Sequence, residues 1–303
     1  MRHFRTLGLL AVVSIALGIL RGDNSEQISI KLPFDAHQDK GGHGGSTAIQ
    51  YHGGPILGGT VGLYVIYYGA FNAAHPIAAQ SIVNDFLSSL SETPQFDVNT
   101  TYYGTSQGNV TGSLGVPTIA YDAAYSQGTS LGSSSIPKII QTAITNGLKA
   151  DSTGVYFVIT SPDVKVSGFC RSFCAYHTRT TISGIDIKYA LIPDPGQACN
   201  GCDGNFFLSG KTTTPNGDIG GDEMTDSIMH ELSETVTDPD LNAWYTSSGA
   251  ENGDLCNFNY GTTYVAANGS TANAHLGSRD YLIQTIWENA SPGFCANTYP
   301  ANK

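Results

Sequence analysis

The chain has 303 residues, which is enough to build one or two domains around a sizeable core. Charged residues make up only 13%, and glycine occurs 36 times and tyrosine 16 times, a composition that suits a β-rich exported protein better than a helical bundle. The formal net charge of −11, with lysines and arginines scattered singly, excludes nucleic-acid binding, because a phosphate backbone needs a basic patch.

The N-terminus has the pattern of a secretory signal. Arg2 and Arg5 precede an apolar run over residues 7–20, which is shorter than the roughly 20 residues of a comfortable membrane span. A membrane anchor is the alternative. We predict a signal peptide over residues 1–22 and, because the next segment is polar and Gly-rich, a flexible lead-in or propeptide over 23–50. A single domain over 51–303 would then be secreted, extracellular or in the cell wall, with no membrane contact after signal cleavage.

The first half of this domain alternates strands and helices. Residues 60–69 are dense in Val, Ile and Tyr between glycines, and 154–164 form a second apolar run, so both are predicted strands. Residues 78–91 and 135–150 place apolar side chains at helical spacing, with Pro137 at the start of the second helix. The alternation predicts an α+β (mixed α/β) fold in which helices pack on a mixed sheet.

The second half contains a long helix between cysteine-rich segments. A strand is predicted over 185–195, and a helix over 220–240 with Asp222 as its N-cap and Pro239 preventing its continuation. The chain after this helix has the pattern of short strands and turns. We find neither an internal repeat nor an evident linker after residue 50.

Cysteines and sequons agree with export. An even cysteine count in an exported chain predicts disulfides, although the C-x-x-C at 199–202 with the pair at 170 and 174 also fits a zinc site. The cysteines are Cys170, Cys174, Cys199, Cys202, Cys256 and Cys295. Four N-x-S/T sequons predict glycosylation, at Asn99, Asn109, Asn268 and Asn289.

The stretch SIMHELSETVTDP, residues 227–239, predicts a metal site on the long helix. His230 and Glu234 are four residues apart, so they share a helix face, and the spacing resembles H-E-x-x-H with the second histidine replaced. Both would bind a divalent ion, and Glu231 would take a proton from the bound water. Glu251 and Asp254 are the candidate further ligands, with Asp238 and Asp240 less favoured because Pro239 turns the chain.

Other interpretations of this stretch stay open. A carboxylate in place of an imidazole makes the bound water less acidic and widens the ion from zinc toward calcium, magnesium or manganese. The site could then hold metal without hydrolysing anything. Alternatively, Glu231 and Glu234 are solvent-facing acids and His230 is a core histidine.

Several collinear segments resemble one family. They include YHGGPILGG near residue 51, FCRSFCAYH at 169–177, the helix segment ending in DPDLNAWY, and DLCNFNYGT at 254–262. Together these resemble the EXORDIUM, or phosphate-induced protein, family over roughly residues 50–297. The resemblance implies a secreted extracellular or cell-wall protein, linked in plants to growth and to carbon and phosphate responses.

The family helix in turn resembles that of zincin metallopeptidases. This implies a zincin-like mixed sheet, a central helix of the active-site type and a disulfide-bridged C-terminal subdomain, with His230 and Glu234 as helix ligands and Glu231 as the base. We expect Cys256–Cys295 and two bridges among the other four cysteines. His177 and His52 are interpreted as structural. The two leading functions are a metal-dependent, peptidase-like hydrolase with an unknown extracellular substrate, and a non-catalytic growth-signalling or cell-wall-polymer-binding protein; a two-carboxylate glycosidase ranks last.

Overall fold

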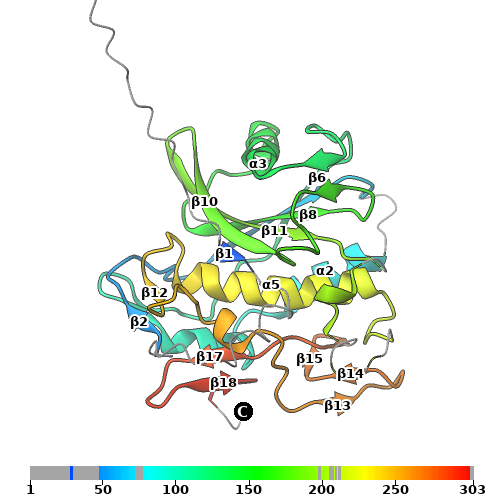
Figure 1. The fold of residues 1–303 in the computed structure, drawn as a ribbon. Helices are drawn as coiled ribbons and strands as arrows, with labels where there is room; N and C mark the ends of the chain where they lie inside the picture. Colours follow the sequence, from blue (N-terminus) through cyan, green and yellow to red (C-terminus); the bar gives the residue numbers. More distant parts are fainter. Residues whose placement is uncertain are drawn as a thin grey trace, which may run out of the picture.

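A computed structural model describes residues 28–29, 48–71, 78–196, 199–204, 208, 210 and 213–300. The predicted signal peptide and most of the predicted lead-in lie outside these residues. Figure 1 shows the described chain in layers: one helix above a sheet, two helices below the sheet, and small hairpins below these. Among the described residues, no helix is both long and apolar enough to cross a membrane.

One six-stranded mixed sheet forms the centre of the molecule. Its strands lie in the order β1-β10-β11-β8-β3-β6. Neighbouring strands from β11 to β6 are parallel, whereas β10 pairs antiparallel with both β11 and β1. They are β1 (Ile28–Ser29), β10 (Tyr176–Ile182), β11 (Ile185–Pro193), β8 (Gly154–Thr160), β3 (Gly62–Tyr68) and β6 (Thr118–Asp122). The predicted mixed sheet is therefore confirmed. The polar strands β10 and β6 were not predicted, because neither has a simple apolar alternation.

Helices cover both faces of the sheet. Helix α3 (Ile136–Thr145) packs on the face that carries Ile66 and Val158, with Pro137 in its first turn as expected. Helices α2 (Ala78–Ser89) and α5 (Ile219–Thr237) pack on the opposite face. Alternate side chains along β3 and β8 thus enter two separate apolar cores.

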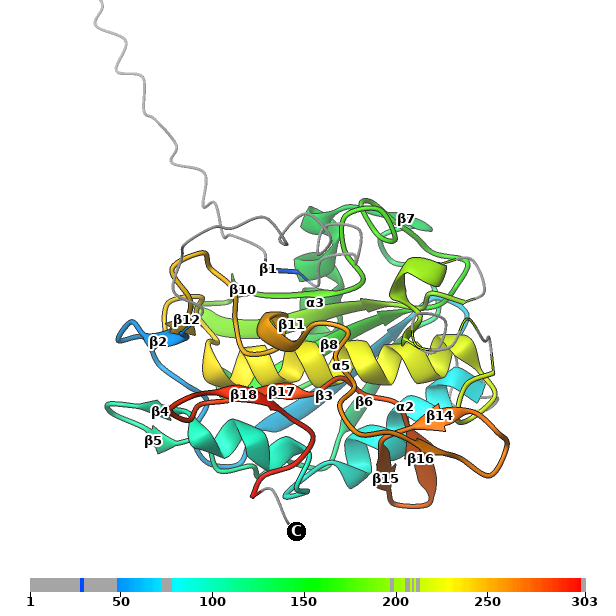
Figure 2. The ribbon, with the colours of Figure 1, turned by 60° about the horizontal axis from the view of Figure 1, so that its bottom comes forward.

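Helix α5 is buried along almost its whole length. It runs between the sheet and the C-terminal hairpins, as the turned view in Figure 2 also shows. It begins earlier than predicted, because Asp218 is the N-cap and its Oδ1 accepts a hydrogen bond from the Gly221 amide at 2.8 Å. Asp222 instead lies inside the first turn and accepts hydrogen bonds from Asn216. Gly220 and Gly221 are part of the helix.

The remaining elements are short, and for the chain after α5 this agrees with the predicted short strands and turns. The paired strands are β2 (Gln50–Tyr51) with β12 (Trp244–Tyr245), β4 (Tyr103–Gly104) with β5 (Gly108–Asn109), β7 (Ser130–Leu131) with β9 (Lys165–Val166), β13 (Tyr264–Val265) with β14 (Thr271–Ala272), β15 (Ala274–Leu276) with β16 (Arg279–Tyr281), and β17 (Ile286–Glu288) with β18 (Phe294–Ala296). The 3-10 helices are η1 (Phe96–Thr101), η2 (Ser133–Ser135), η3 (Asn200–Cys202) and η4 (Asp254–Cys256).

All six cysteines form disulfides, which confirms the expected bridging. Cys256 pairs with Cys295 and ties η4 to β18 within the C-terminal part. The other two bridges join the segment before β10 to the segment before α5, and they are Cys170–Cys199 and Cys174–Cys202. Only one of the three bridges therefore lies within the predicted C-terminal subdomain.

Candidate metal centre

Helix α5 carries the first part of the centre. His230, Glu231 and Glu234 are each 0% exposed, because both faces of α5 are covered. The predicted one-turn spacing brings His230 Nε2 to 2.9 Å from Glu234 Oε1. The alternative in which these acids face solvent is therefore wrong.

The segment that leads into η4 supplies the second part. Glu251 is fully buried, and Asp254 places Oδ1 3.9 Å from His230 Nε2 while its amide donates to Glu234 Oε1 at 3.1 Å. Gly253 allows this approach, since a Cβ there would lie 2.9 Å from Glu234 Oε1. The Cys256 bridge anchors the segment just after these residues. Both predicted further acids thus lie at the helix.

The two less favoured acids have other roles. Asp238 ends α5 and accepts hydrogen bonds from the amides of Asn242 and Ala243, each at 2.6 Å. Asp240 pairs with Lys188 at 3.3 Å. Both acids thus have hydrogen-bond or ion-pair partners outside the cluster.

A second histidine joins the cluster from the sheet. His177, on β10, is 0% exposed, and its Nε2 lies 3.0 Å from Glu251 Oε2 and 3.4 Å from Glu234 Oε2. His177 was predicted to be structural, because a lone histidine in a sequence commonly is. The available signal was its place in FCRSFCAYH, where the Cys174 bridge fixes the chain three residues earlier.

Two overlapping triads could each hold a cation. One is His230, Glu234 and Asp254, and the other is His177, Glu231 and Glu234; in each, one potential ligand atom per residue lies within 4.8 Å of the others. Glu234 belongs to both, with Oε1 toward His230 and Oε2 toward His177. The donor set of imidazole nitrogens and carboxylate oxygens fits a divalent ion.

Several potential ligand atoms of the cluster have few hydrogen-bond partners. Glu251 Oε1 is buried and makes no hydrogen bond, and buried His230 Nε2 and Glu234 Oε2 have only the ion-pair contacts given above. A buried polar atom without a hydrogen bond costs about 1–3 kcal/mol, and a buried charge costs more. A cation among these atoms would remove that cost.

The pKa values of the clustered side chains also indicate that a positive charge is favoured among the carboxylates. Burial by itself would lower the pKa of His230, but the charge of Glu234 outweighs it, with help from Glu231 and Asp254, and raises the pKa to about 10. Burial lowers the pKa of His177 to about 4, against the charge of Glu234. The pKa of Glu251 is raised well above its usual range, mainly by burial and further by the charges of Glu234 and Asp238. A divalent cation would compete with the protons on His230 and Glu251.

Gln284 orients the His230 ring. Its Nε2 donates to the Gly253 carbonyl at 3.0 Å, which turns Oε1 toward His230 Nδ1, also at 3.0 Å. An amide oxygen accepts only, so Nδ1 carries a proton, and Nε2 faces the carboxylates, where a cation could replace its proton. Gln284 was not predicted, because no spacing rule relates it to the helix.

The four predicted sequons differ in their surroundings. Asn109 and Asn268 are exposed, and Asn289 is half-buried. Asn99 is 0% exposed, and its side-chain amide donates to the Ser233 hydroxyl of α5 at 3.1 Å. Its position leaves no room for a glycan, so glycosylation at Asn99 does not fit this fold.

Fold and site together define a disulfide-bridged α+β protein with a buried histidine–carboxylate cluster on its central helix. The chain belongs to the family described as the phosphate-induced protein 1 conserved region, whose model matches residues 49–297. It is similar to Protein EXORDIUM-like 3 of Arabidopsis thaliana, with 30% identity over 84% of this chain and 85% of the relative. Protein EXORDIUM-like 5 of the same plant is 32% identical over 79% and 75%.

A further relative comes from another plant. Protein PHOSPHATE-INDUCED 1 of Nicotiana tabacum is 29% identical over 65% of this chain and 67% of its own length. No solved structure matches the chain. The resemblance drawn from the sequence is thereby confirmed at the level of the family.

Proposed function

We propose that this chain is an exported protein whose core is organised around a buried divalent cation held by α5. The observation that carries the proposal is the convergence of two histidines and four carboxylates in fully or largely buried positions. They are His177, His230, Glu231, Glu234, Glu251 and Asp254. Three segments supply them, namely β10, α5 and the chain that leads into η4, so one cation would link the sheet, the central helix and the C-terminal part. Export is supported by the three disulfides, which persist in an oxidising compartment.

Zinc is the ion that these donors favour. Imidazole ligands suit zinc and its transition-metal neighbours, whereas calcium and magnesium prefer oxygen alone. The second histidine, His177, strengthens this choice relative to a helix site with His230 alone. The many carboxylates keep manganese, calcium and magnesium as weaker competitors.

A structural role for the cation is the leading interpretation. Structural zinc sites are closed, whereas catalytic ones keep a position open for water or substrate. His177, His230, Glu231 and Glu234 have no exposed surface, so a polymer or peptide would not reach the ion without a rearrangement. The protein would then act outside the cell as a non-catalytic signalling or cell-wall-polymer-binding protein.

A metal-dependent, peptidase-like hydrolase is the second candidate. The one-turn spacing of His230 and Glu234, with Glu231 beside them, favours it by analogy with a zincin-like helix. In this role Glu231 would take a proton from metal-bound water. Glu231→Gln would then abolish hydrolysis of a peptide library while the protein keeps its metal.

The decisive experiment is metal analysis of the secreted protein. We expect about one equivalent of zinc by mass spectrometry, and an unfolding midpoint that falls by about 5 °C or more after dialysis against a chelator. His230→Ala should lose the metal. The matched control is His275→Ala, because His275 is exposed and pairs with Asp280 away from the cluster.

Two results would contradict the proposal. One is wild-type protein that takes up no stoichiometric ion even after incubation with zinc, manganese or calcium. The other is a chelator that leaves the unfolding midpoint unchanged. Because the chelator test uses the wild-type chain, the outcome does not depend on whether His230→Ala folds.

A further inference from the structure

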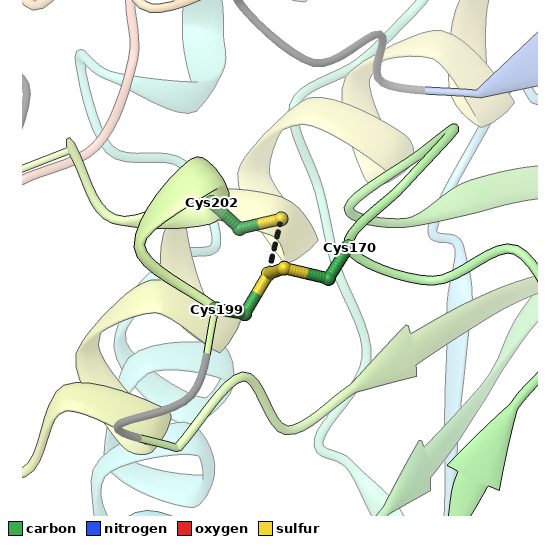
Figure 3. Close-up of side chains that lie close together, drawn as sticks. All are labelled: Cys170, Cys199 and Cys202. Carbon is green, nitrogen blue, oxygen red and sulfur yellow. Dashed lines mark hydrogen bonds between the residues drawn. A yellow bond between two sulfur atoms is a disulfide. The ribbon is translucent and has the colours of Figure 1, made fainter.

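Two disulfides that join the segment before β10 to the segment before α5 are in contact with each other. The sulfur of Cys199, bonded to Cys170, lies 3.3 Å from the sulfur of Cys202, bonded to Cys174 (Figure 3). Cys170 is half-buried, whereas Cys174, Cys199 and Cys202 are each at most 5% exposed. We call Cys170, Cys174, Cys199 and Cys202 the four-cysteine cluster.

We infer that the four-cysteine cluster is a disulfide-exchange site in which a single external thiol severs both cross-links. A thiolate attacks the more accessible sulfur, Cys170, and forms a mixed disulfide with it. The bond from Cys170 to Cys199 breaks, and Cys199 leaves as a thiolate. This thiolate lies in contact with the sulfur of the second bridge.

The second step needs little movement. The Cys199 thiolate attacks Cys202, the Cys199–Cys202 bond forms, and Cys174 leaves as a thiolate that takes a proton from water. One thiol enters and one thiol is released, and the number of disulfides stays at two, so the sequence needs no oxidant. Cys199 and Cys202 are spaced for a local bridge, because the Cys202 amide donates to the Cys199 carbonyl at 3.1 Å in the turn that forms η3.

The exchange changes which parts of the chain are linked. Both original bridges join the segment before β10 to the segment before α5, across 29 and 28 residues. The new bridge spans only the turn at 199–202. The segment before β10 is thereby released from the segment before α5, and an external thiol is converted into a local loosening of the fold.

The test is limited reduction of the wild-type protein. Reduced glutathione is added at about one equivalent, free thiols are alkylated with N-ethylmaleimide, and peptides are mapped without reduction. We expect glutathione on Cys170, a Cys199–Cys202 peptide and alkylated Cys174, with Cys256–Cys295 intact. Alkylated Cys199 beside an intact Cys174–Cys202 bridge would overturn the inference.

Two variants provide an independent test without glutathione. Cys174→Ser leaves a Cys202 thiol next to the Cys170–Cys199 bridge, and we expect part of the protein to carry Cys199–Cys202 with alkylated Cys170. The matched control is Cys256→Ser, whose free Cys295 lies outside the four-cysteine cluster and should produce no rearranged bridge. A Cys174→Ser protein in which Cys199 is bonded to Cys170 in every molecule would count against exchange.

Discussion

Gln284 determines which nitrogen of His230 faces the acids. Its side-chain amide is held by the Gly253 carbonyl, and its own backbone amide donates to Asp226 at 2.6 Å, so the side chain has little freedom to turn. Hydrogen bonds of this kind fix the tautomer of a metal-binding histidine and raise its basicity. Gln284 is thus a positioning residue for the proposed site.

Replacing Gln284 should weaken metal binding without removing a ligand. We expect Gln284→Ala to lower zinc affinity by about 10–100-fold, because the ring would lose its orientation. Competition with a chromophoric chelator measures this. Gln141→Ala is the control, since Gln141 is exposed on α3 and bonds only locally to Thr145. Equal zinc affinity in the two variants would contradict the role of Gln284.

At the scale of elements, the contact between α2 and α5 helps to set where His230, Glu231 and Glu234 lie. Gly221 has no side chain at the crossing, and a Cβ there would lie 2.8 Å from Ala79 Cα and 2.8 Å from Ile82 Cδ1. The close approach keeps α5 against α2 and the sheet. The glycine is therefore explained by packing, despite its cost in a helix.

Gly221→Ala should consequently destabilise the protein. In an open helix this substitution gains about 0.5–1 kcal/mol, whereas here overpacking should lower the free energy of unfolding by about 1–3 kcal/mol. Urea unfolding followed by circular dichroism measures the change. Ser227→Ala on the same helix, at a partly exposed position, should stay within about 0.5 kcal/mol of the wild type. A stabilised Gly221→Ala protein would show that the two helices can move apart at no cost.

At the scale of the whole molecule, several of the acidic side chains are buried. Asp194, at the end of β11, is buried, and burial together with the charge of Asp218 raises its pKa from 3.8 to about 6, although the Gly196 amide opposes the rise. Burial likewise raises the pKa of Asp238 to about 6. Buried acids with raised pKa values favour the folded state at low pH, because the folded chain holds protons that the unfolded chain has released.

Asp194 should therefore make stability fall as the pH rises. Its contribution is intact below about pH 4, is lost between about pH 4 and 6, and amounts to about 2–3 kcal/mol. Asp194→Asn keeps an acceptor for the Gly196 amide and cannot ionise, so it should become more stable than the wild type above pH 6 but not at pH 4. Urea midpoints at the two pH values measure the difference. An identical pH dependence in both proteins would contradict the raised pKa.

Local features of the sequence were enough to predict much of the fold. Helices α2, α3 and α5 follow from apolar spacing and from Pro137, and β3, β8 and β11 follow from continuous apolar runs. The pairing of His230 with Glu234 follows from the pitch of a helix. Strand β10 was missed because Thr and Arg dominate it, and it is a strand because β11 pairs with it along its length.

The tertiary structure decided what no local pattern contains. His177 contacts Glu251 across 74 residues of chain, because β10 and the segment leading into η4 both pack against α5. The same packing buries Glu231 and Glu234, which a solitary helix would expose to water. The sequence by itself determined the α+β class, the cysteine-bridged character and two neighbours on one helix, because these depend on spacing along the chain. The composition of the cluster and the contact between two disulfides depend on distances between elements, which are set by how the whole chain folds.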